Sequence, residues 1–447
     1  MFIYKLLDSF QENGNSIAFI HIDKKYSYND LYKLTYEYKL KLDSSNLIDS
    51  SIVALHTDFS PESIAIIFAL IIKKCIIVPF SSNSVIESSN ALDICGCDFI
   101  ISFNILNKKI NIFENKIYIE NKLLDEFKII DNAGFILFSS GTSGTPKAIL
   151  HNFEIIISRF TIQKKPFSVV TFLMIDHFGG LNTIFGILCS GGTAVTLEDR
   201  SVYKVCKAIE DYSVDILPTT PSFLTMLLAS NLLNVFNFSS LKKITYGTEI
   251  MPNVTLTKLR NLLPNIIFQQ TYGLSEVGVL QSKSKNDGSL WFKLGGNGFD
   301  LKIVDNILWI KSKFSMIGYI NYPNSFDEDG YFNTQDIVEK DGEYFKIIGR
   351  NSDIINVGGQ KVYPAEIENI LLEDENVLDV LVFAEIHPFI GNIVVAKLQL
   401  SFNEELKEIK SRLRKKCILK LSSYKIPVKF YTTIEPLIGA RMKKIRH

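Results

Sequence analysis

A polar loop between two apolar runs constrains this chain more than any other feature. Residues 138–147 read FSSGTSGTPK and lie between the apolar runs 134–138 and 148–150. This pattern predicts a strand, a glycine-rich loop and a returning strand. Glycines let the backbone approach a phosphate closely, while hydroxyls and amides donate hydrogen bonds to its oxygens and Lys147 adds charge. The alternative is a flexible surface linker, which the apolar flanks argue against.

The loop is not a Walker A motif, because no Gly-Lys-Ser/Thr stands at the required place. We predict that the residues in contact with phosphate are Ser139, Ser140, Gly141, Thr142, Ser143, Gly144, Thr145 and Lys147.

The composition indicates a globular protein of several packed units. At roughly 150 residues per unit, 447 residues suggest two or three units. Lys+Arg and Asp+Glu both total 48, so no excess of positive charge favours a nucleic-acid partner. The six cysteines are scattered, the N-terminus does not resemble a signal peptide, and the longest apolar run, 64–72, is too short to span a bilayer. We expect a cytoplasmic protein with free thiols and no transmembrane segment.

The order of the predicted elements indicates an α/β fold. Helical segments alternate with strand-like apolar runs, which include 51–56, 75–79, 169–175 and 266–273. Such alternation predicts parallel-rich sheets with crossover helices, in which ligands bind beyond the carboxyl ends of the strands. Short strands from about residue 291 predict a small β-barrel-like unit. We expect a large N-terminal domain, 1–350, followed by a small mobile α+β domain, 351–447.

A second motif, at 270–276, reads QTYGLSE and ends in a carboxylate, the oxygen ligand that Mg²⁺ prefers. Together with 139–147, it resembles the adenylate-forming (ANL) superfamily, and within it the acyl-CoA synthetase / AMP-dependent ligase family. The resemblance implies that Tyr272 stacks near an adenine, that Ser275 contacts the α-phosphate and that Glu276 holds Mg²⁺. Thr271 and Gly273 belong to the same nucleotide-binding motif.

The turn 247–249 matches the family loop that lies against the adenine and the acyl pocket. The family often has Gly-Gly-Ala there, so Thr248 and Glu249 make this loop more polar. We assign Gly247, Thr248 and Glu249 to nucleotide binding. An ordinary turn between a strand and a helix is the alternative.

The segment 327–336 resembles the family's ribose-binding motif. A carboxylate accepts two hydrogen bonds from a diol, so Asp336 is expected to hold the ribose hydroxyls. Gln335 replaces the usual glycine, and a positive φ at this position would cost roughly 1 kcal/mol or more. Arg350, which is permanently charged, is expected to bind ribose or phosphate.

The remainder of the chain resembles the family's hinge, tunnel and tail. The hinge falls on Ser352, and Gly358 and Gly359 would line a thiol tunnel once the small domain has turned. Ungapped counting places the catalytic lysine, which would bridge the carboxylate and the α-phosphate, on Lys443. Lys444 is the rival assignment, and a solvated basic tail is the alternative to both.

His177 bears on the substrate class. Acyl and aryl ligases of the family often carry His-x-x-Gly at this strand end, as in 177–180 here. Amino-acid adenylation domains usually carry an aspartate at this position, which pairs with the substrate ammonium. Asp176 adjoins His177, but using it would shift the spacing to the Gly191-Gly192 turn. We therefore favour a carboxylic acid that is not an amino acid, and a core histidine is the alternative for His177.

These motifs predict ATP-dependent activation of a fatty, short-chain or aryl acid as an acyl-adenylate, with ATP and Mg²⁺. The acyl group would pass to coenzyme A or to the phosphopantetheine of an acyl carrier protein. The catalytic residues expected are Lys443, Glu276, His177 and Ser275. Two alternatives remain: an amino-acid-adenylating ligase that loads a carrier protein, and a nucleotide-binding homologue impaired in catalysis.

Overall fold

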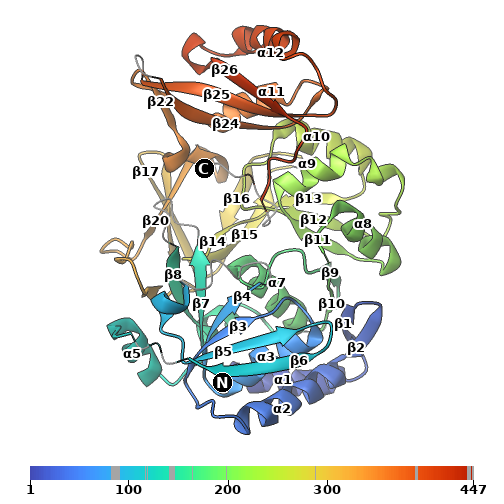
Figure 1. Ribbon diagram of the computed structural model, residues 1–447, viewed down its shortest axis with the longest axis vertical. Helices are drawn as coiled ribbons and strands as arrows, with labels where there is room; N and C mark the ends of the chain where they lie inside the picture. The colour runs from blue at the N-terminus through green and yellow to red at the C-terminus, as the bar shows by residue number, and fades with distance from the viewer. Residues whose placement is uncertain are drawn as a thin grey trace.

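A computed structural model describes all of the chain except residues 82–90, 116, 118, 140–145, 164, 198, 287, 388–390, 440–443 and 445–447. Figure 1 shows two sheets with their helices at the base and on the right, a third sheet on the left, and the C-terminal elements stacked above them. The α/β fold expected from the sequence is confirmed.

The first sheet is built around the strand that leads into the polar loop. Its order is β19-β8-β7-β4-β3-β5-β6, and its inner pairs, β7–β4, β4–β3 and β3–β5, are parallel. The bounds are Gly318–Tyr319, Lys147–Asn152, Gly134–Ser139, Ile76–Phe80, Ile52–His56, Phe99–Asn104 and Lys109–Glu114.

The second sheet is parallel except for its terminal hairpin, β1–β2. Its order is β13-β12-β11-β9-β10-β1-β2. The bounds are Ile267–Gln270, Lys243–Tyr246, Ile216–Thr219, Ser168–Val170, Thr193–Val195, Ile17–His21 and Lys24–Ser27.

Two apolar helices join these sheets into one core. All of α3 (Pro61–Ile72) except its last residue is buried, and most of α7 (Phe178–Cys189) is buried as well. A helix that is apolar all round must be covered on every side. The same hydrophobic cluster contains strand residues from both sheets together with α1 (Phe2–Asn13) and α2 (Tyr28–Asp43). The two sheets therefore share a core, with α3 and α7 packed inside it.

Further helices cover the outer faces of the two sheets, while α6 contributes to the shared core. Helices α8, α9 and α10 cover the second sheet, and α5 packs on the first. The bounds of α5, α6, α8, α9 and α10 are Lys122–Ile129, Phe153–Ile157, Val202–Asp211, Pro221–Ala229 and Asn253–Leu262, and η1 spans Leu232–Asn234.

The third sheet is antiparallel throughout and begins at Tyr272, earlier than the β-barrel-like unit expected from about residue 291. Its order is β14-β15-β16-β21-β20-β18-β17. The bounds are Tyr272–Leu274, Gly278–Ser284, Phe292–Gly295, Tyr344–Arg350, Phe332–Asp341, Ile307–Ser312 and Phe299–Val304.

The elements after Arg350, here called the C-terminal unit, have a core of their own that contains only residues from 355 onward. The boundary of a mobile domain at 350/351 stays a prediction. The unit contains a hairpin, a three-stranded sheet β24-β25-β26 and two helices. The bounds of β22, β23, β24, β25, β26, α11 and α12 are Ile355–Val357, Gln360–Val362, Val377–His387, Gly391–Leu400, Lys429–Thr433, Pro364–Leu371 and Leu406–Lys420, with η2 at Asn351–Asp353 and η3 at Ser423–Lys425.

Two strand predictions were too long. The run 169–175 forms a strand only to Val170, because the chain then bends where the Thr171 amide donates to the Val195 carbonyl at 2.9 Å. The run 266–273 contains two strands, β13 and β14, which belong to different sheets. Thr271 stands between them, at the point where the chain leaves the parallel sheet for the antiparallel one.

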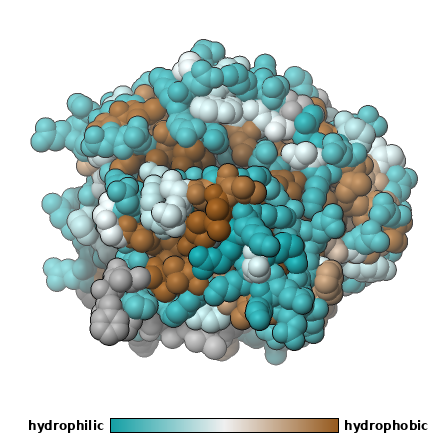
Figure 2. Space-filling view, turned by 90° about the horizontal axis from the view of Figure 1, so that it is seen from above, coloured by the Kyte–Doolittle hydropathy of each residue, from teal (hydrophilic) through white to brown (hydrophobic). Residues whose placement is uncertain are grey.

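Figure 2 views the molecule from the end that carries the C-terminal unit, and apolar patches there are interrupted by hydrophilic side chains. Among the helices that the structure describes, none is long and apolar enough to cross a membrane.

An ion-pair network stabilises the C-terminal unit and should make its stability depend on pH. The Arg412 guanidinium and the Lys416 ammonium hold the pKa of Asp374 at about 2. A lowered carboxyl pKa contributes stability above the unfolded-state value, near 3.9, and that contribution disappears as the pH falls toward 2.

We therefore expect Asp374→Asn to be less stable than wild type by about 1 kcal/mol at pH 7, after allowance for screening of the partly exposed cations. The difference, measured by urea unfolding, should shrink below pH 4 and vanish near pH 2. Glu339→Gln, which removes an exposed ion pair with Lys346, should change little. A difference that stays constant across this pH range would contradict the assignment.

Candidate active site

The base of the polar loop is held by strand pairing and by one asparagine. Ser139 ends β7 and is the register partner of Lys147, which begins β8. The Asn321 side chain donates to the Pro146 carbonyl at 2.8 Å and accepts from the Ala148 amide at 2.9 Å. The predicted phosphate-binding residues 140–145 lie outside the described residues. The two ends that anchor them are therefore fixed side by side.

Lys147 and Glu276 meet around one tyrosine. The Tyr319 hydroxyl donates to Glu276 Oε1 at 2.8 Å, and Lys147 Nζ lies over the rings of Tyr319 and Tyr322, 5.1 and 5.2 Å from their centres. Burial, with the Glu276 charge, raises the pKa of Tyr319, so its hydroxyl stays protonated and donates. The last residue of the first motif and the acidic residue of the second thus share one cluster.

Glu276 fits the expected role of a magnesium ligand. Tyr319 occupies one carboxylate oxygen, and within the described part of the chain no donor occupies the other. The described residues contain no group of three metal-ligating side chains. Mg²⁺ commonly binds one or two carboxylates together with substrate phosphates and water, so a single carboxylate beside the loop is a suitable donor set.

A buried carboxylate joins the second motif to the ribose motif. Asp336 is 6% exposed and accepts hydrogen bonds from the Tyr272 hydroxyl at 2.6 Å and from Arg350 Nε at 3.0 Å. Burial raises the pKa of the Asp336 carboxyl, and Arg350 and Tyr272 oppose that rise. Burial also disfavours the charged form of Arg350, but Asp336 and, to a smaller extent, Glu276 raise its pKa on balance. Glu276 is therefore within electrostatic range of this second cluster.

Tyr272 is more deeply buried than a tyrosine whose ring only stacks on an adenine would need to be. Its side chain is only 6% exposed and belongs to the core of the antiparallel sheet. Its hydroxyl donates to Asp336 and so fixes the orientation of that carboxylate. Ser275 and Gly273 lie in the same segment and are partly exposed.

The 247–249 turn packs directly on the second motif. A Cβ atom on Gly247 would lie 2.5 Å from Thr271 Oγ1 and 2.7 Å from the Thr271 carbonyl oxygen, so no other residue fits without movement. The Thr271 amide donates to the Tyr246 carbonyl at 2.7 Å. Thr248 has a φ of 71°, which is strained for a β-branched residue.

Gln335 keeps the left-handed backbone of the glycine that it replaces, with a φ of 61°. The turn is thus retained, and its cost is the roughly 1–2 kcal/mol of a non-glycine residue in this region. The Asn351 side chain donates to Gln335 Oε1 at 3.4 Å, a long contact that compensates little of that cost.

His177 is the residue before α7 and is half-buried. Gly180, in the first turn of this helix, is required because a Cβ there would lie 2.0 Å from the Met174 carbonyl oxygen. The neighbouring Asp176 is buried and accepts a hydrogen bond from Ser81 Oγ at 3.1 Å. Asp176, which directly precedes the histidine motif, therefore already has a hydrogen-bond partner within the chain.

Residues 6–305 match the family model described as AMP-binding enzyme, which is two thirds of the chain. This chain belongs to the AMP-binding enzyme family.

Curated relatives in this family include ligases that form coenzyme A thioesters. Acyl-CoA synthetase 7 of Caenorhabditis elegans is 31% identical over 283 residues, which cover 56% of this chain and only 52% of that protein. The 2-succinylbenzoate–CoA ligase of Staphylococcus epidermidis is 24% identical over 456 residues, which cover 95% of this chain and 93% of that protein.

Solved structures of other proteins show the same fold. An anthranilate CoA ligase in complex with anthranoyl-AMP has a TM-score of 0.83 at 17% identity, covering 98% of this chain and 95% of that one. The o-succinylbenzoate CoA synthetase of Bacillus subtilis has a TM-score of 0.74 at 21% identity, covering 99% and 96%.

In this member of the AMP-binding enzyme family, the two candidates for the catalytic lysine are Lys443 and Lys444. Lys443 lies outside the described residues, and Lys444 is described. The Lys444 side chain is 10% exposed, and its Nζ lies 2.8 Å from Asp379 Oδ1 and donates to the Val380 carbonyl at 2.8 Å. Both partners belong to β24, so the Lys444 side chain is bound within the C-terminal unit.

The predicted hinge and tunnel residues do not join the site in this conformation. Ser352 lies in η2 and donates to its neighbour Asp353 at 2.9 Å. Gly358 and Gly359 form the exposed turn between β22 and β23, with φ values of 55° and 84°. Among the described residues, nothing lies within 4 Å of a Cβ atom built on either glycine.

Sequence reasoning missed one residue of the site. Tyr319 links Glu276 to Lys147, but it lies on a short strand outside any motif, so no local pattern indicated it.

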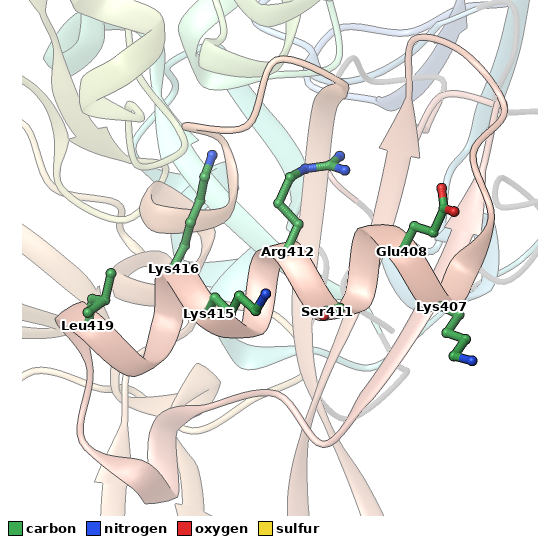
Figure 3. Close-up of a pocket in the computed structure, with 7 residues that line it drawn as sticks. All are labelled: Lys407, Glu408, Ser411, Arg412, Lys415, Lys416 and Leu419. Carbon is green, nitrogen blue, oxygen red and sulfur yellow. The ribbon is translucent and has the colours of Figure 1, made fainter.

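A hollow on the outer face of α12 is not part of this site (Figure 3). Arg412 and Lys416 point to the same side of the helix there and pair with Asp374. Arg412 also pairs with Glu404. These cations are engaged in holding α12 to the C-terminal unit.

The close contact between the two nucleotide motifs gives a first test of the site. We expect Gly247→Ala to displace Thr271, lower the stability by roughly 1–3 kcal/mol and weaken ATP binding. Thermal unfolding and calorimetric titration with ATP measure the two effects. Gly349→Ala is the matched control, since its Cβ would meet only Tyr363 Cδ1 at 3.7 Å. Unchanged ATP binding by a folded Gly247→Ala protein would contradict the contact.

The buried Lys444 ammonium gives a second test. Lys444→Ala should destabilise the C-terminal unit by about 3–5 kcal/mol, because the buried Asp379 carboxylate would lose its cation. Hydrogen exchange across β24 measures this loss. An Asp379→Asn change in the Lys444→Ala background should recover part of the stability. If Lys444→Ala leaves exchange in β24 unchanged, the ion pair does not form.

Proposed function

We propose that this protein is an ATP-dependent acid–thiol ligase that forms an acyl-adenylate and then transfers the acyl group to a thiol. The observation that carries the proposal is the pair of clusters Tyr272–Asp336–Arg350 and Lys147–Tyr319–Glu276, which are linked by the short segment from Tyr272 to Glu276. They come from separate motifs of an AMP-binding family member, and together they suit a ribose and a polyphosphate.

In the first half-reaction, a carboxylate oxygen would bond to the α-phosphorus of ATP while the bond to pyrophosphate breaks. Asp336 and Arg350 would hold the ribose, and the loop ending at Lys147 would hold the phosphates. Glu276 would hold Mg²⁺, which supplies charge neutralisation on the phosphates. The work of these residues is mainly positioning and charge stabilisation.

In the second half-reaction, a thiol would attack the acyl carbon and AMP would leave. The exposed turn Gly358–Gly359 would have to reach the site, so we propose that the C-terminal unit turns about Ser352 between the two steps. Coenzyme A is the acceptor that the names of the relatives favour. The phosphopantetheine of an acyl carrier protein is the alternative acceptor.

The proposed substrate is an acyl or aryl acid and not an amino acid. His177 fits the acid-ligase pattern, and Asp176 already accepts a hydrogen bond from Ser81. The relatives named for 4-coumarate and 2-succinylbenzoate make aryl acids the first class to test. The six cysteines are buried and unpaired, which supports a reducing, cytoplasmic setting.

Exchange of labelled pyrophosphate into ATP tests the first half-reaction. We expect exchange that depends on both Mg²⁺ and an acid, across a panel of aryl, short-chain, fatty and amino acids. Exchange driven only by an amino acid would replace the proposed substrate class. If no acid in the panel supports exchange, that result would favour a nucleotide-binding homologue that is impaired in catalysis.

Replacing Lys443 tests its proposed role in adenylation. Lys443→Ala should lower exchange by at least about 100-fold, because one donor to the developing charge is lost, while ATP still binds. Lys443→Arg keeps the charge but not the geometry and should recover little. Calorimetric titration with ATP provides the binding control. Full exchange activity in Lys443→Ala would remove this residue from the mechanism.

A further inference from the structure

Lys444, near the end of the chain, contacts both the C-terminal unit and the part of the molecule that precedes residue 351. The Lys444 amide donates to Glu249 Oε1 at 2.8 Å, although its side chain is bound within the C-terminal unit. The Ile438 backbone pairs with Lys444 in an antiparallel bridge. In Figure 1 the red end of the chain descends from the C-terminal unit toward the strands below it. Glu249 is thus the point at which the tail is attached to the nucleotide-binding side.

The Glu249 carboxylate is itself held in place. Its second oxygen accepts hydrogen bonds from Ser222 Oγ at 2.7 Å and from the Ser222 amide at 3.2 Å. Ser222 is 2% exposed and lies in the first turn of α9, where a negative charge is favourable. One carboxylate therefore bridges a buried helix start and the tail.

The turn that carries Glu249 is strained. Thr248 has a φ of 71°, while Gly247 on its other side is packed against Thr271. A strained backbone persists only where its surroundings fix it, and such positions gather at functional sites. Here the turn 247–249 contacts Thr271 of the second motif on one side and Lys444 of the tail on the other. The second motif and the tail are therefore connected through this turn.

Another polar contact between the C-terminal unit and the rest of the chain lies at the start of α10. The Asn253 amide donates to Asn369 Oδ1 at 2.9 Å, which joins the start of α10 to α11. A single amide-to-carboxylate hydrogen bond can form and break within each turnover. The Glu249 contact is therefore suited to a position that must be held in one step and released in the next.

We infer that Glu249 is a positioning residue for adenylation, which holds the tail against the large part of the molecule by accepting the Lys444 amide. The contact is adjacent in the chain to Lys443, the lysine that we propose for adenylation. The inference rests on the proposed function. It predicts that Glu249 matters for acyl-adenylate formation and not for thiol transfer.

The two half-reactions separate this role from a general structural one. Glu249→Ala should lower kcat for pyrophosphate exchange by roughly tenfold or more, because one hydrogen bond to a charged acceptor is lost. Thioester formation from added acyl-adenylate should fall much less than pyrophosphate exchange does, because that step does not need the contact between Glu249 and the tail. Glu249→Gln, which retains an acceptor oxygen, should recover most of the exchange.

Two controls and one physical readout complete the test. Asn369→Ala removes a different described contact between the C-terminal unit and the rest of the chain, the one with Asn253, and should not reproduce the pattern. Hydrogen exchange of the C-terminal peptide should lose protection in Glu249→Ala whether or not a substrate is known. Equal losses in both half-reactions, the same pattern in Asn369→Ala, or unchanged protection would each overturn the inference. The wild type could show no pyrophosphate exchange while Glu249→Ala still loses protection from hydrogen exchange. That result would defeat the proposed function and leave the attachment of the tail supported.

Discussion

The buried Asp336 carboxylate is the constraint on which the arrangement of the site depends. A carboxylate removed from water needs hydrogen bonds and an opposite charge, and here Tyr272 and Arg350 supply them. Those three residues come from the nucleotide motif, the ribose motif and the last strand before the C-terminal unit. Satisfying one buried charge therefore fixes three distant segments of the sequence against one another.

A second cluster repeats this logic at the other side of the site. Tyr319 donates to Glu276, and Lys147 lies over its ring, so one tyrosine contacts both the end of the polar loop and the acidic residue of the second motif. Both contacts depend on the same side chain, which comes from a third segment of the chain.

Sequence motifs named Asp336, Arg350 and Tyr272, and the structure brings these three side chains into contact, while their roles toward a ligand stay predictions. The motifs gave no signal where the chain crosses between sheets. The break at Thr271 could not be predicted, since the apolar run 266–273 has no signal for a change of sheet. Tyr319 was missed because its role depends on the pairing of β19 with β8, which joins residues far apart in the chain.

The departures from the family pattern at Gln335 and Thr248 are of one physical kind. Both place a residue with a side chain in the left-handed region, at 61° and 71°, and each costs roughly 1–2 kcal/mol. Glycine would adopt either backbone without that cost. At Gln335 the side chain makes only a long contact with Asn351, so little offsets the strain there. At Thr248 the strain coincides with a carboxylate that is bonded on both sides, so the turn is held by the contacts of Glu249 and Gly247 and not by its own preference.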